Sequence, residues 1–277
     1  MSQTNMDKRR MCSNCRAFIT TDDRVCPYCQ TEVGPRAIDR QGAADAMAGL
    51  IQGDRFITTL ILLINVGFYV ATLLMFTDGR KISMDPSFDA LLAFGGKRAD
   101  AIIGAGQWWR LITAGFLHGG ILHIGMNMWV LYDLGPQIDE VFGAFRYLTI
   151  YFVATVAGFG ASLYWAPFVL SIGASAGIAG LVGAMVGLGT REKHSVIGAN
   201  RGRYVQWMLF ILVQGFIISG IDNAAHIGGF LGGFVIAYLA GSKGHARGED
   251  FVWRTAAYVS LAVTAYAFFR MFQWLFR

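Results

Sequence analysis

The chain has 277 residues, and its composition is that of a protein embedded in lipid. Hydrophobic residues make up 55% of it and charged residues only 15%, with a formal net charge of +5, whereas a soluble domain carries about 25% charged residues. Too few charges remain to cover a water-facing surface. This composition excludes a soluble enzyme, a disordered chain and a nucleic-acid binder that acts through its net charge.

The first element along the chain is a cysteine-rich segment, residues 1–33. Its two CxxC pairs are separated by ten residues and consist of Cys12, Cys15, Cys26 and Cys29. Each pair can direct two thiolates at one ion, so together they complete a tetrahedral zinc site. Two disulfides or four unpaired thiols are the alternatives, but the topology derived below places the segment in a reducing compartment, which favours zinc.

This segment is too short to build an apolar core, so bound metal would supply most of its folding free energy. We predict a small zinc ribbon with a structural Zn²⁺, which could serve a cytoplasmic protein partner. The following residues 34–54 are rich in Ala, Gly and polar side chains and are predicted to form a linker. A charged, cysteine-rich start is also unlike a cleavable signal peptide.

The rest of the chain contains long runs without Asp, Glu, Lys or Arg, and the run Tyr147–Thr190 has 44 such residues. About 20 apolar residues cross the hydrocarbon core of a membrane as a helix. We predict an all-α polytopic membrane protein in which the fourth helix, short and rich in Gly and Ala, is buried centrally. The seven predicted helices are Phe56–Phe76, Phe116–Leu134, Tyr147–Pro167, Ser175–Thr190, Tyr204–Ile221, Asn223–Leu239 and Thr255–Trp274.

The distribution of basic residues in the short loops predicts the orientation. The loops after the third and fifth helices contain no Lys or Arg. Those after the fourth and sixth contain Arg191, Lys193, Arg201, Arg203, Lys243 and Arg247. The N-terminus is therefore predicted to be cytoplasmic and the C-terminus to lie outside. The connection 78–110 is basic although it lies on the outer side, and its two tryptophans indicate a structured loop partly within the membrane.

Polar residues inside membrane spans are costly and suggest function. The second, fourth and sixth helices all run inward from the outer face. Their first turns contain His118, His123, Asn127, Ser175 and His226, which should therefore lie at similar depth. A hydroxyl, an imidazole and further hydrogen-bonding groups at one depth favour a nucleophile, a base and an oxyanion site.

Each of these residues also has a structural interpretation. A serine among small residues commonly packs, a histidine near a membrane interface is commonly hydrogen-bonded, and Asn127 could bond a neighbouring helix. Asp222, four residues before His226, could complete a triad or be a solvated helix end. Glycines at four-residue spacing after Ser175 and after His226 would bring the fourth and sixth helices close together.

Four motifs occur in order along the chain: Trp109-Arg110, His118-Gly-Gly-Ile-Leu-His123-Ile-Gly-Met-Asn127, Gly173-Ala-Ser175 and Asn223-Ala-Ala-His226-Ile-Gly-Gly. Over about residues 55–242 this pattern resembles the signature of rhomboid intramembrane serine proteases. The resemblance implies a rhomboid-like six-helix core. Residues 243–277 would then add a loop and a seventh, C-terminal transmembrane helix.

The resemblance also implies a Ser–His dyad without a catalytic aspartate. Ser175 would be the nucleophile and His226 the general base. His123 and Asn127, with the Ser175 backbone N–H, would bind the oxyanion. No metal or other cofactor would be needed for catalysis.

Other family positions carry over less directly. Trp109-Arg110 corresponds to the loop that lies sideways in the outer leaflet, and either Asp139 or Glu140 occupies the place of a family glutamate that closes the second helix. Two positions depart from the pattern. Ala176 stands where glycine is frequent after the nucleophile, and Ala179 stands where some members stack an aromatic ring on the catalytic imidazole.

These observations predict a serine endopeptidase that cleaves membrane proteins, single-span or polytopic, in or next to their transmembrane segments. Its partners would be these substrates and the lipid bilayer, without nucleic acid. The alternative is a catalytically inactive relative acting as a membrane chaperone or adaptor, although such relatives typically lose the serine or the histidine. A small-solute transporter would require two repeated halves with broken helices, and the sequence has no such repeat.

Overall fold

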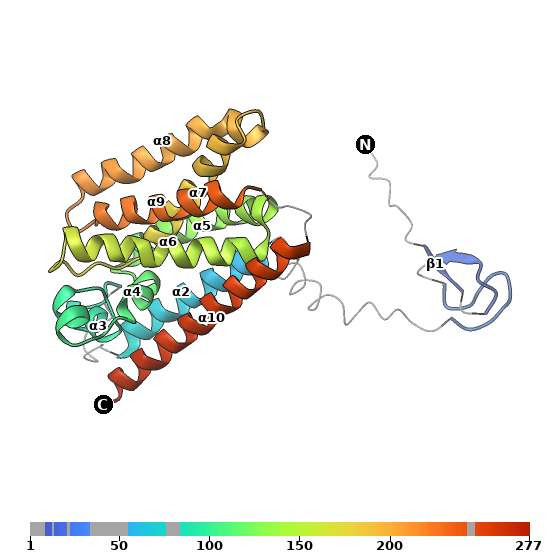
Figure 1. Ribbon diagram of the computed structural model, residues 1–277. Coiled ribbons are helices and arrows are strands. Elements are labelled where there is room, and N and C mark those ends of the chain that lie inside the picture. The colour runs from blue at the N-terminus through green and yellow to red at the C-terminus, as the bar shows by residue number, and fades with distance from the viewer. Residues whose placement is uncertain (1–8, 13, 21–22, 34–54, 76–83, 243–246) are drawn as a thin grey trace. The chain divides into compact units, whose positions relative to one another are not determined.

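A computed structural model describes residues 9–12, 14–20, 23–33, 55–75, 84–242 and 247–277 (Figure 1). The chain divides into two compact units, Met1–Gln52 and Gly53–Arg277, and each is described by itself. The predicted linker, residues 34–54, lies outside the described residues, as do Arg80, Lys81 and Lys243.

The N-terminal unit is a small β-structure. Strands β1 (Arg9–Met11) and β2 (Phe18–Thr20) pair antiparallel, and an isolated bridge joins Val25 and Glu32. Its buried apolar residues are Cys12, Ile19, Cys26 and Val33. A core of this size cannot stabilise a fold, and half of its members are cysteines.

The second unit is helical, which confirms the predicted all-α class. Its long helices are α2 (Phe56–Met75), α5 (Ile121–Phe142), α6 (Ala144–Trp165), α7 (Ser175–Arg191), α8 (Val196–Ile217), α9 (Asn223–Ala240) and α10 (Arg247–Leu275). Shorter turns between α2 and α5 are α3 (Phe88–Ala93), the π-turn η1 (Asp100–Gly104), α4 (Arg110–Thr113) and the 3₁₀ turn η2 (Ala114–Phe116).

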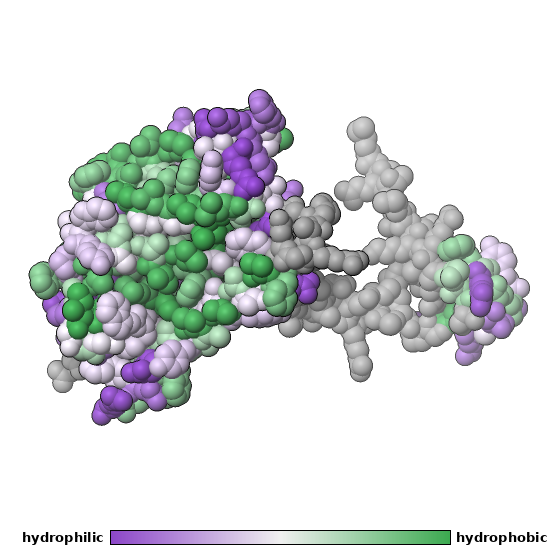
Figure 2. All heavy atoms as spheres, in the orientation of Figure 1, coloured by the Kyte–Doolittle hydropathy of each residue, from purple (hydrophilic) through white to green (hydrophobic). Residues whose placement is uncertain are grey.

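Among the described residues, four helices are long and apolar enough to cross a membrane by length and composition. They are α2, α6, α9 and the Phe251–Leu275 part of α10. Large apolar side chains on these and neighbouring helices face outward, such as Leu74 (73% exposed) and Phe216 (84%). Figure 2 shows a largely hydrophobic face on this unit, with hydrophilic residues gathered toward its ends. Such a surface needs lipid around it, so the protein is an integral multi-pass membrane protein.

Helix α7 forms the centre of the helical unit, as predicted. It packs against α5, α6, α8 and α9, and every residue from Ala176 to Gly189 is buried. Small side chains allow this position, because four neighbouring helices can approach α7 closely only where few side-chain atoms stand between the backbones. The helix has 17 residues. This is shorter than the roughly 20 residues of a typical span, but a helix surrounded by protein does not have to match the thickness of the hydrocarbon core.

The closest packing in this unit is between α7 and α9. A Cβ atom added at Gly183 would overlap the Phe230 carbonyl oxygen, and one added at Gly233 would overlap the Gly180 carbonyl oxygen. The two backbones are therefore in direct contact, as the glycine spacing predicts. This contact brings the N-terminal ends of α7 and α9 together.

The seventh long helix, α10, packs on the bundle rather than standing apart. Phe268 stacks on Phe68 of α2 with ring centroids 4.6 Å apart, and its ring meets Phe116 of η2 edge-on at 5.1 Å. Figure 1 shows α10 running beside α2. The C-terminal helix thus covers the turn that leads into α5.

The predicted second helix, Phe116–Leu134, was wrong at both ends, since α5 begins at Ile121 and ends at Phe142. Gly119 and Gly120 have low helix propensity, which delays the start. Pro136 does not end the helix, because the loss of one backbone donor is tolerated within packed transmembrane helices. Gly143, at φ +77°, terminates it instead.

The predicted fifth helix began too late, at Tyr204, because hydropathy marks only the apolar part of a helix. Helix α8 begins at Val196, where the Ser195 hydroxyl caps the helix by accepting a hydrogen bond from the Gly198 N–H at 3.0 Å. Arg201 and Arg203, expected in a loop, therefore lie on the first turns of α8. The last helix likewise begins earlier than predicted, at Arg247.

The contact between α7 and α9 predicts a large cost for a single methyl group. Gly233→Ala should destabilise the protein by about 1–3 kcal/mol because the added Cβ meets backbone that cannot move aside. Gly160→Ala, in α6, is the matched control, since nothing lies within 4 Å of its added Cβ, and alanine is the better helix former. Thermal unfolding in detergent micelles measures both. Equal melting temperatures for the two variants would contradict the packing described.

Candidate active site

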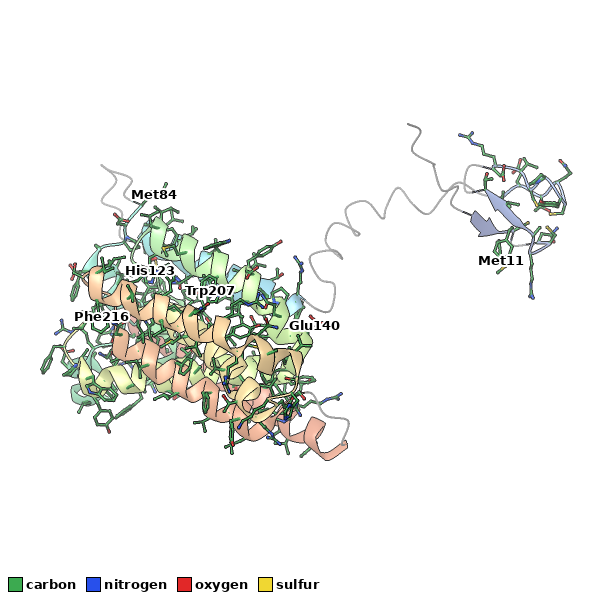
Figure 3. The ribbon with its side chains drawn as sticks, turned by 90° about the horizontal axis from the view of Figure 1, so that it is seen from above. Met11, Met84, His123, Glu140, Trp207 and Phe216 are labelled. Carbon is green, nitrogen blue, oxygen red and sulfur yellow. The ribbon has the colours of Figure 1, made fainter. Side chains whose placement is uncertain are left out.

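The polar residues singled out in the sequence gather at one end of the helical unit. Ser175 is the first residue of α7, His226 lies in the first turn of α9, and His123 lies in the first turn of α5. Figure 3 labels His123 toward this end of the bundle and Glu140, near the other end of α5, at the opposite end. The predicted common depth therefore follows from three helices that start at the same level.

Ser175 and His226 form a direct hydrogen bond. The Ser175 Oγ and the His226 Nε2 lie 2.9 Å apart, within the 2.6–3.2 Å that proton transfer between a nucleophile and its base requires. His226 is buried and Ser175 half-buried. The close approach of α7 and α9 sets this distance, since the two residues are 51 positions apart in the chain.

Asp222 does not serve His226 as a third member. Its carboxylate caps α9 by accepting a hydrogen bond from the Ala225 N–H at 3.1 Å, and it accepts a second from the Ser162 hydroxyl of α6. Among the described residues, the buried Nδ1 of His226 has no hydrogen-bond partner. Ser175 and His226 therefore form a hydrogen-bonded pair, and Asp222 anchors the start of the helix that carries the histidine.

His123 is oriented by the backbone that precedes α5. Its Nδ1 accepts a hydrogen bond from the Gly119 N–H at 3.3 Å, so in the neutral ring the proton is on Nε2. A Cβ added at Gly173 would lie 2.8 Å from this Nε2 and 3.4 Å from the Ser175 Oγ. The Nε2–H of His123 and the Ser175 hydroxyl thus border the same small space, which a side chain at position 173 would occupy.

Two further donors belong to this end of the bundle. Asn127 is buried and lies one turn after His123 on the same face of α5. The first backbone N–H groups of α7, which begin at Ser175, have no partner within the helix. The positive end of the helix dipole also points here. An anion beside Ser175 would therefore find side-chain and backbone donors.

His118 does not lie in the first turn of a helix, contrary to prediction. It is fully buried in the segment before α5, and its ring meets that of His123 edge-on with centroids 5.0 Å apart. Neither of its ring nitrogens has a hydrogen-bond partner among the described residues. Its role in this structure is therefore to pack against the His123 ring.

The connection before α5 holds two cations that sequence reasoning did not treat as part of the site. Lys97 is fully buried; its Nζ donates to the Ala166 carbonyl at 2.5 Å, and its backbone pairs with Ser171. Burial lowers the pKa of Lys97, and the charge of Asp222 opposes this shift. The side chain thus ties this loop to the segment that leads into Ser175. The sequence feature that could have pointed to Lys97 is its place in the basic connection 78–110, which was predicted to lie on the outer side.

Arg110, from the Trp109-Arg110 motif, is the second buried cation. It donates to the Gln107 side chain at 2.6 Å and to the Leu92 and Gly96 carbonyls at 2.7 and 2.9 Å, and its guanidinium lies over the Trp109 ring. Burial lowers the pKa of Arg110 to about 10, so it stays charged at neutral pH. It holds the loop in its folded form.

Four further positions that the family pattern singles out, Asp139, Glu140, Ala176 and Ala179, are all within the described residues. Asp139 is buried (7% exposed) near the end of α5, whereas the neighbouring Glu140 is exposed. Ala176 is buried in a small cluster with Ala225. Ala179 is fully buried and offers no ring to stack on His226.

The four N-terminal cysteines form a cluster that could bind a metal. Their Sγ atoms all lie within 4.8 Å of one another, with 3.7 Å between Cys12 and Cys29 and 3.6 Å between Cys15 and Cys26. A tetrahedral Zn²⁺ with Zn–S bonds of about 2.3 Å would hold its sulfurs about 3.8 Å apart. All four cysteines are free rather than disulfide-bonded, so the donor set fits one ion.

The two CxxC turns have the same backbone form. The first cysteine of each accepts a hydrogen bond from the N–H four residues later, and Arg16 and Gln30 at those positions both have positive φ. Hydrogen bonds from the Thr31 side chain and backbone lower the pKa of Cys29 to about 5. The thiolate is the form that binds metal.

Comparison with known proteins agrees with this geometry. A family model described as the Rhomboid domain matches residues 105–243. The chain belongs to the rhomboid family. It is 35% identical over 153 residues to rhomboid protease GluP of Bacillus subtilis, covering 55% of this chain and 30% of GluP.

Other rhomboid relatives match a similar part of the chain. RHOMBOID-like protein 6, mitochondrial, of Arabidopsis thaliana is 33% identical over 174 residues, covering 61% of this chain and 55% of that protein. YdcA of Bacillus subtilis is 30% identical over 144 residues, covering 51% of this chain and 72% of YdcA. The chain thus spans less than two thirds of the length of GluP and of the Arabidopsis protein.

The capping role of Asp222 can be separated from a catalytic one by the reaction of Ser175 with a fluorophosphonate. Asp222→Asn keeps an efficient cap and should label within about threefold of the unaltered rate. Asp222→Ala loses the cap, worth about 1 kcal/mol, and should label more slowly than Asp222→Asn. Labelling rates in detergent measure both, with Ser175→Ala as the blank. A loss of about 10⁴ in Asp222→Asn, as for a triad aspartate, would contradict the assignment.

Proposed function

We propose that this rhomboid protein is an intramembrane serine endopeptidase that cleaves membrane proteins in or next to their transmembrane segments. The observation that carries the proposal is the 2.9 Å hydrogen bond between Ser175 and His226, formed at the start of a buried helix and beside the Nε2 of His123. Nucleophile, base and anion donor thereby share one small space.

The proposed reaction begins with proton transfer. His226, with its proton on Nδ1, accepts the Ser175 proton at Nε2 while the Ser175 Oγ attacks the substrate carbonyl carbon. The imidazolium then gives this proton to the leaving amine, which leaves an acyl-enzyme on Ser175. A water molecule, deprotonated by His226, attacks the ester, and the carboxylic product leaves as the Ser175 hydroxyl is restored.

The negative charge that develops on the carbonyl oxygen needs preorganised donors. The His123 Nε2–H, the Asn127 amide and the Ser175 backbone N–H are proposed to supply them. Gly173 leaves room for that oxygen, because it lacks a side chain and its φ of +125° is one that other residues rarely adopt. Within a largely buried site, such donors act in a low dielectric.

The substrate must expose a carbonyl to Ser175. In a transmembrane helix the carbonyls are engaged in hydrogen bonds, so the cleaved stretch has to unwind. Substrates with helix-weakening residues such as Gly or Pro near the cleavage site should therefore be preferred. Placing the site near the end of the bundle also lets water reach it.

The proposed division of the chain is a ribbon (1–33), a linker (34–54), the protease core (55–242) and a C-terminal span (243–277). The proposed orientation puts the N-terminus in the cytoplasm and the C-terminus outside, so that Ser175 faces the outer side. The basic residues at the inner end of α8 support this. The ribbon is proposed to hold structural zinc and to serve a cytoplasmic protein partner.

The alternative is an inactive rhomboid acting as a membrane chaperone or adaptor. Such a protein needs no serine–histidine pair at bonding distance, and losing either residue would cost it nothing. The presence of both, with His123 oriented toward them, favours the protease.

The proposal predicts the outcome of co-expressing the chain with a panel of single-span membrane proteins. Cleavage of at least one should occur and should disappear in Ser175→Ala. Asn127→Ala should lower the rate about 10²–10³-fold, the usual cost of one oxyanion donor. Immunoblots of substrate fragments measure this. Absence of cleavage together with absence of fluorophosphonate labelling, in a protein that melts normally, would favour the inactive alternative.

The cysteine cluster predicts a zinc content of about one ion per chain. Cys12→Ser with Cys15→Ser should abolish it, because two remaining thiolates cannot complete a tetrahedral site. Elemental analysis of the purified protein measures the content. Chelation should leave the labelling rate of Ser175 unchanged, since no metal takes part in the proposed chemistry. Disulfides or zinc-free protein after purification under reducing conditions would contradict the assignment.

A further inference from the structure

A cavity of about 190 Å³ lies between α5, α7 and α8. Val182 of the central helix is one of its lining residues. The side chains relevant here are Trp129, Asp133 and Gln137 from α5 and Arg203, Tyr204 and Trp207 from α8. The proposed chemistry uses none of them. Two of these side chains are charged and two are tryptophans. Charged side chains are costly on a membrane-facing surface, so their presence there suggests a function.

The two charged residues of this cavity do not neutralise each other. Asp133 and Arg203 line it from facing helices and are both exposed, yet no ion pair within 4 Å joins them among the described residues. The Gln137 amide donates to the Asp133 carboxylate at 3.5 Å, and the Tyr204 hydroxyl donates to the Gln137 carbonyl oxygen at 3.3 Å. The cavity therefore offers one anionic and one cationic side chain, together with the hydrogen-bonded Gln137 and Tyr204.

The side chains that line the cavity are of the kinds found at a membrane interface, and they lie part-way along both helices rather than at their ends. Arg203 lies seven residues after the start of α8, about 10 Å along it, and Asp133 lies nine residues before the end of α5, about 14 Å from it. Figure 3 labels Trp207 between His123 and Glu140 along the bundle. Tryptophan is typical of the headgroup level, and exposed charges are costly deeper in the membrane.

The charge-free part of α8 that follows Arg203 is shorter than the hydrocarbon core of a bilayer. Helix α8 carries no charged residue from Tyr204 to Ile217, a span of about 20 Å, whereas the hydrocarbon core of a bilayer is about 30 Å thick. A lipid that lies against this face therefore has its headgroup close to Arg203. This makes a phospholipid the occupant that the surroundings favour.

We propose that this cavity binds the headgroup of a zwitterionic aminophospholipid, with the phosphate at Arg203 and the ammonium at Asp133. The headgroup carries one charge of each sign, as the cavity does. A primary ammonium can donate hydrogen bonds to Asp133, and the ring faces of Trp129 and Trp207 attract cations. The quaternary ammonium of a choline headgroup has no N–H to donate, so it can interact only with the tryptophan rings. In the proposed orientation the lipid belongs to the cytoplasmic leaflet.

The test is native mass spectrometry of the full chain released from micelles containing phosphatidylethanolamine, phosphatidylcholine or phosphatidylglycerol. Phosphatidylethanolamine should be retained best. Arg203→Gln and Asp133→Asn should each weaken its binding about tenfold, the loss expected for one charged hydrogen bond. Arg201→Gln and Glu140→Gln are matched controls on the same helices, and neither residue lines the cavity. They should retain the lipid fully.

Phosphatidylglycerol has the phosphate but no ammonium group. Its binding therefore distinguishes a site that recognises both charges from one that only attracts phosphate to Arg203. Asp133→Asn should weaken phosphatidylethanolamine binding but strengthen phosphatidylglycerol binding, because it removes a repulsive charge. Equal losses for Arg203→Gln and Arg201→Gln, or a preference for phosphatidylglycerol in the unaltered protein, would overturn the proposal. Unchanged lipid retention together with a raised KM for substrate cleavage in Arg203→Gln would assign the cavity to substrate instead.

Discussion

The direct backbone contact between α7 and α9 is the constraint on which the rest of this structure depends. In lipid, helices gain little from burying apolar surface, so close association has to come from dispersion contacts over matching small-residue faces. Glycines on both helices provide those faces. Because Ser175 and His226 lie at the first turns of these two helices, the same contact sets the 2.9 Å between them. Stability and the Ser175–His226 geometry thus depend on one interface, and a methyl group deep in the bundle can alter the geometry at its end.

Around this interface, the chain holds its irregular segments by satisfying polar groups internally. Backbone outside helices is tolerated at membrane depth only where protein satisfies its donors and acceptors. Arg110 donates to two carbonyls of the loop before α5, and Lys97 ties that loop to the segment before Ser175. From the lipid side, Phe268 of α10 covers Phe116, two residues before His118. The seventh helix therefore supports the segment from which the Gly119 N–H orients His123.

Much of this arrangement could be predicted from the sequence, because charge-free runs and helix direction alone place residues at a common depth. That reasoning brought His123, Ser175 and His226 together. It failed where hydropathy and helix formation diverge: α8 begins at its Ser195 cap, well before its apolar part, and glycines delay the start of α5 beyond His118. The burial of Lys97 and the cavity between α5 and α8 depend on how distant segments pack, which no local pattern encodes. The residue types alone favoured a nucleophile, a base and an oxyanion site, and the rhomboid resemblance assigned a predicted role to each residue.

Among the described residues, the Nδ1 of His226 has no hydrogen-bond partner, so no carboxylate holds its ring. In a triad, an acid holds the imidazole in one tautomer and stabilises its cation. Here the orientation has to come from packing: the ring is buried, its backbone N–H bonds the Asp222 carbonyl, and Asp222 is itself held by Ser162 of α6. The Asp222 carboxylate, the nearest in sequence, thus fixes the start of α9 rather than the His226 ring. In the proposed chemistry, a base held in this way leaves its imidazolium poorly stabilised, so the larger share of transition-state stabilisation falls to the proposed oxyanion donors. His123, held by Gly119, is then as important to the geometry as the Ser175–His226 pair.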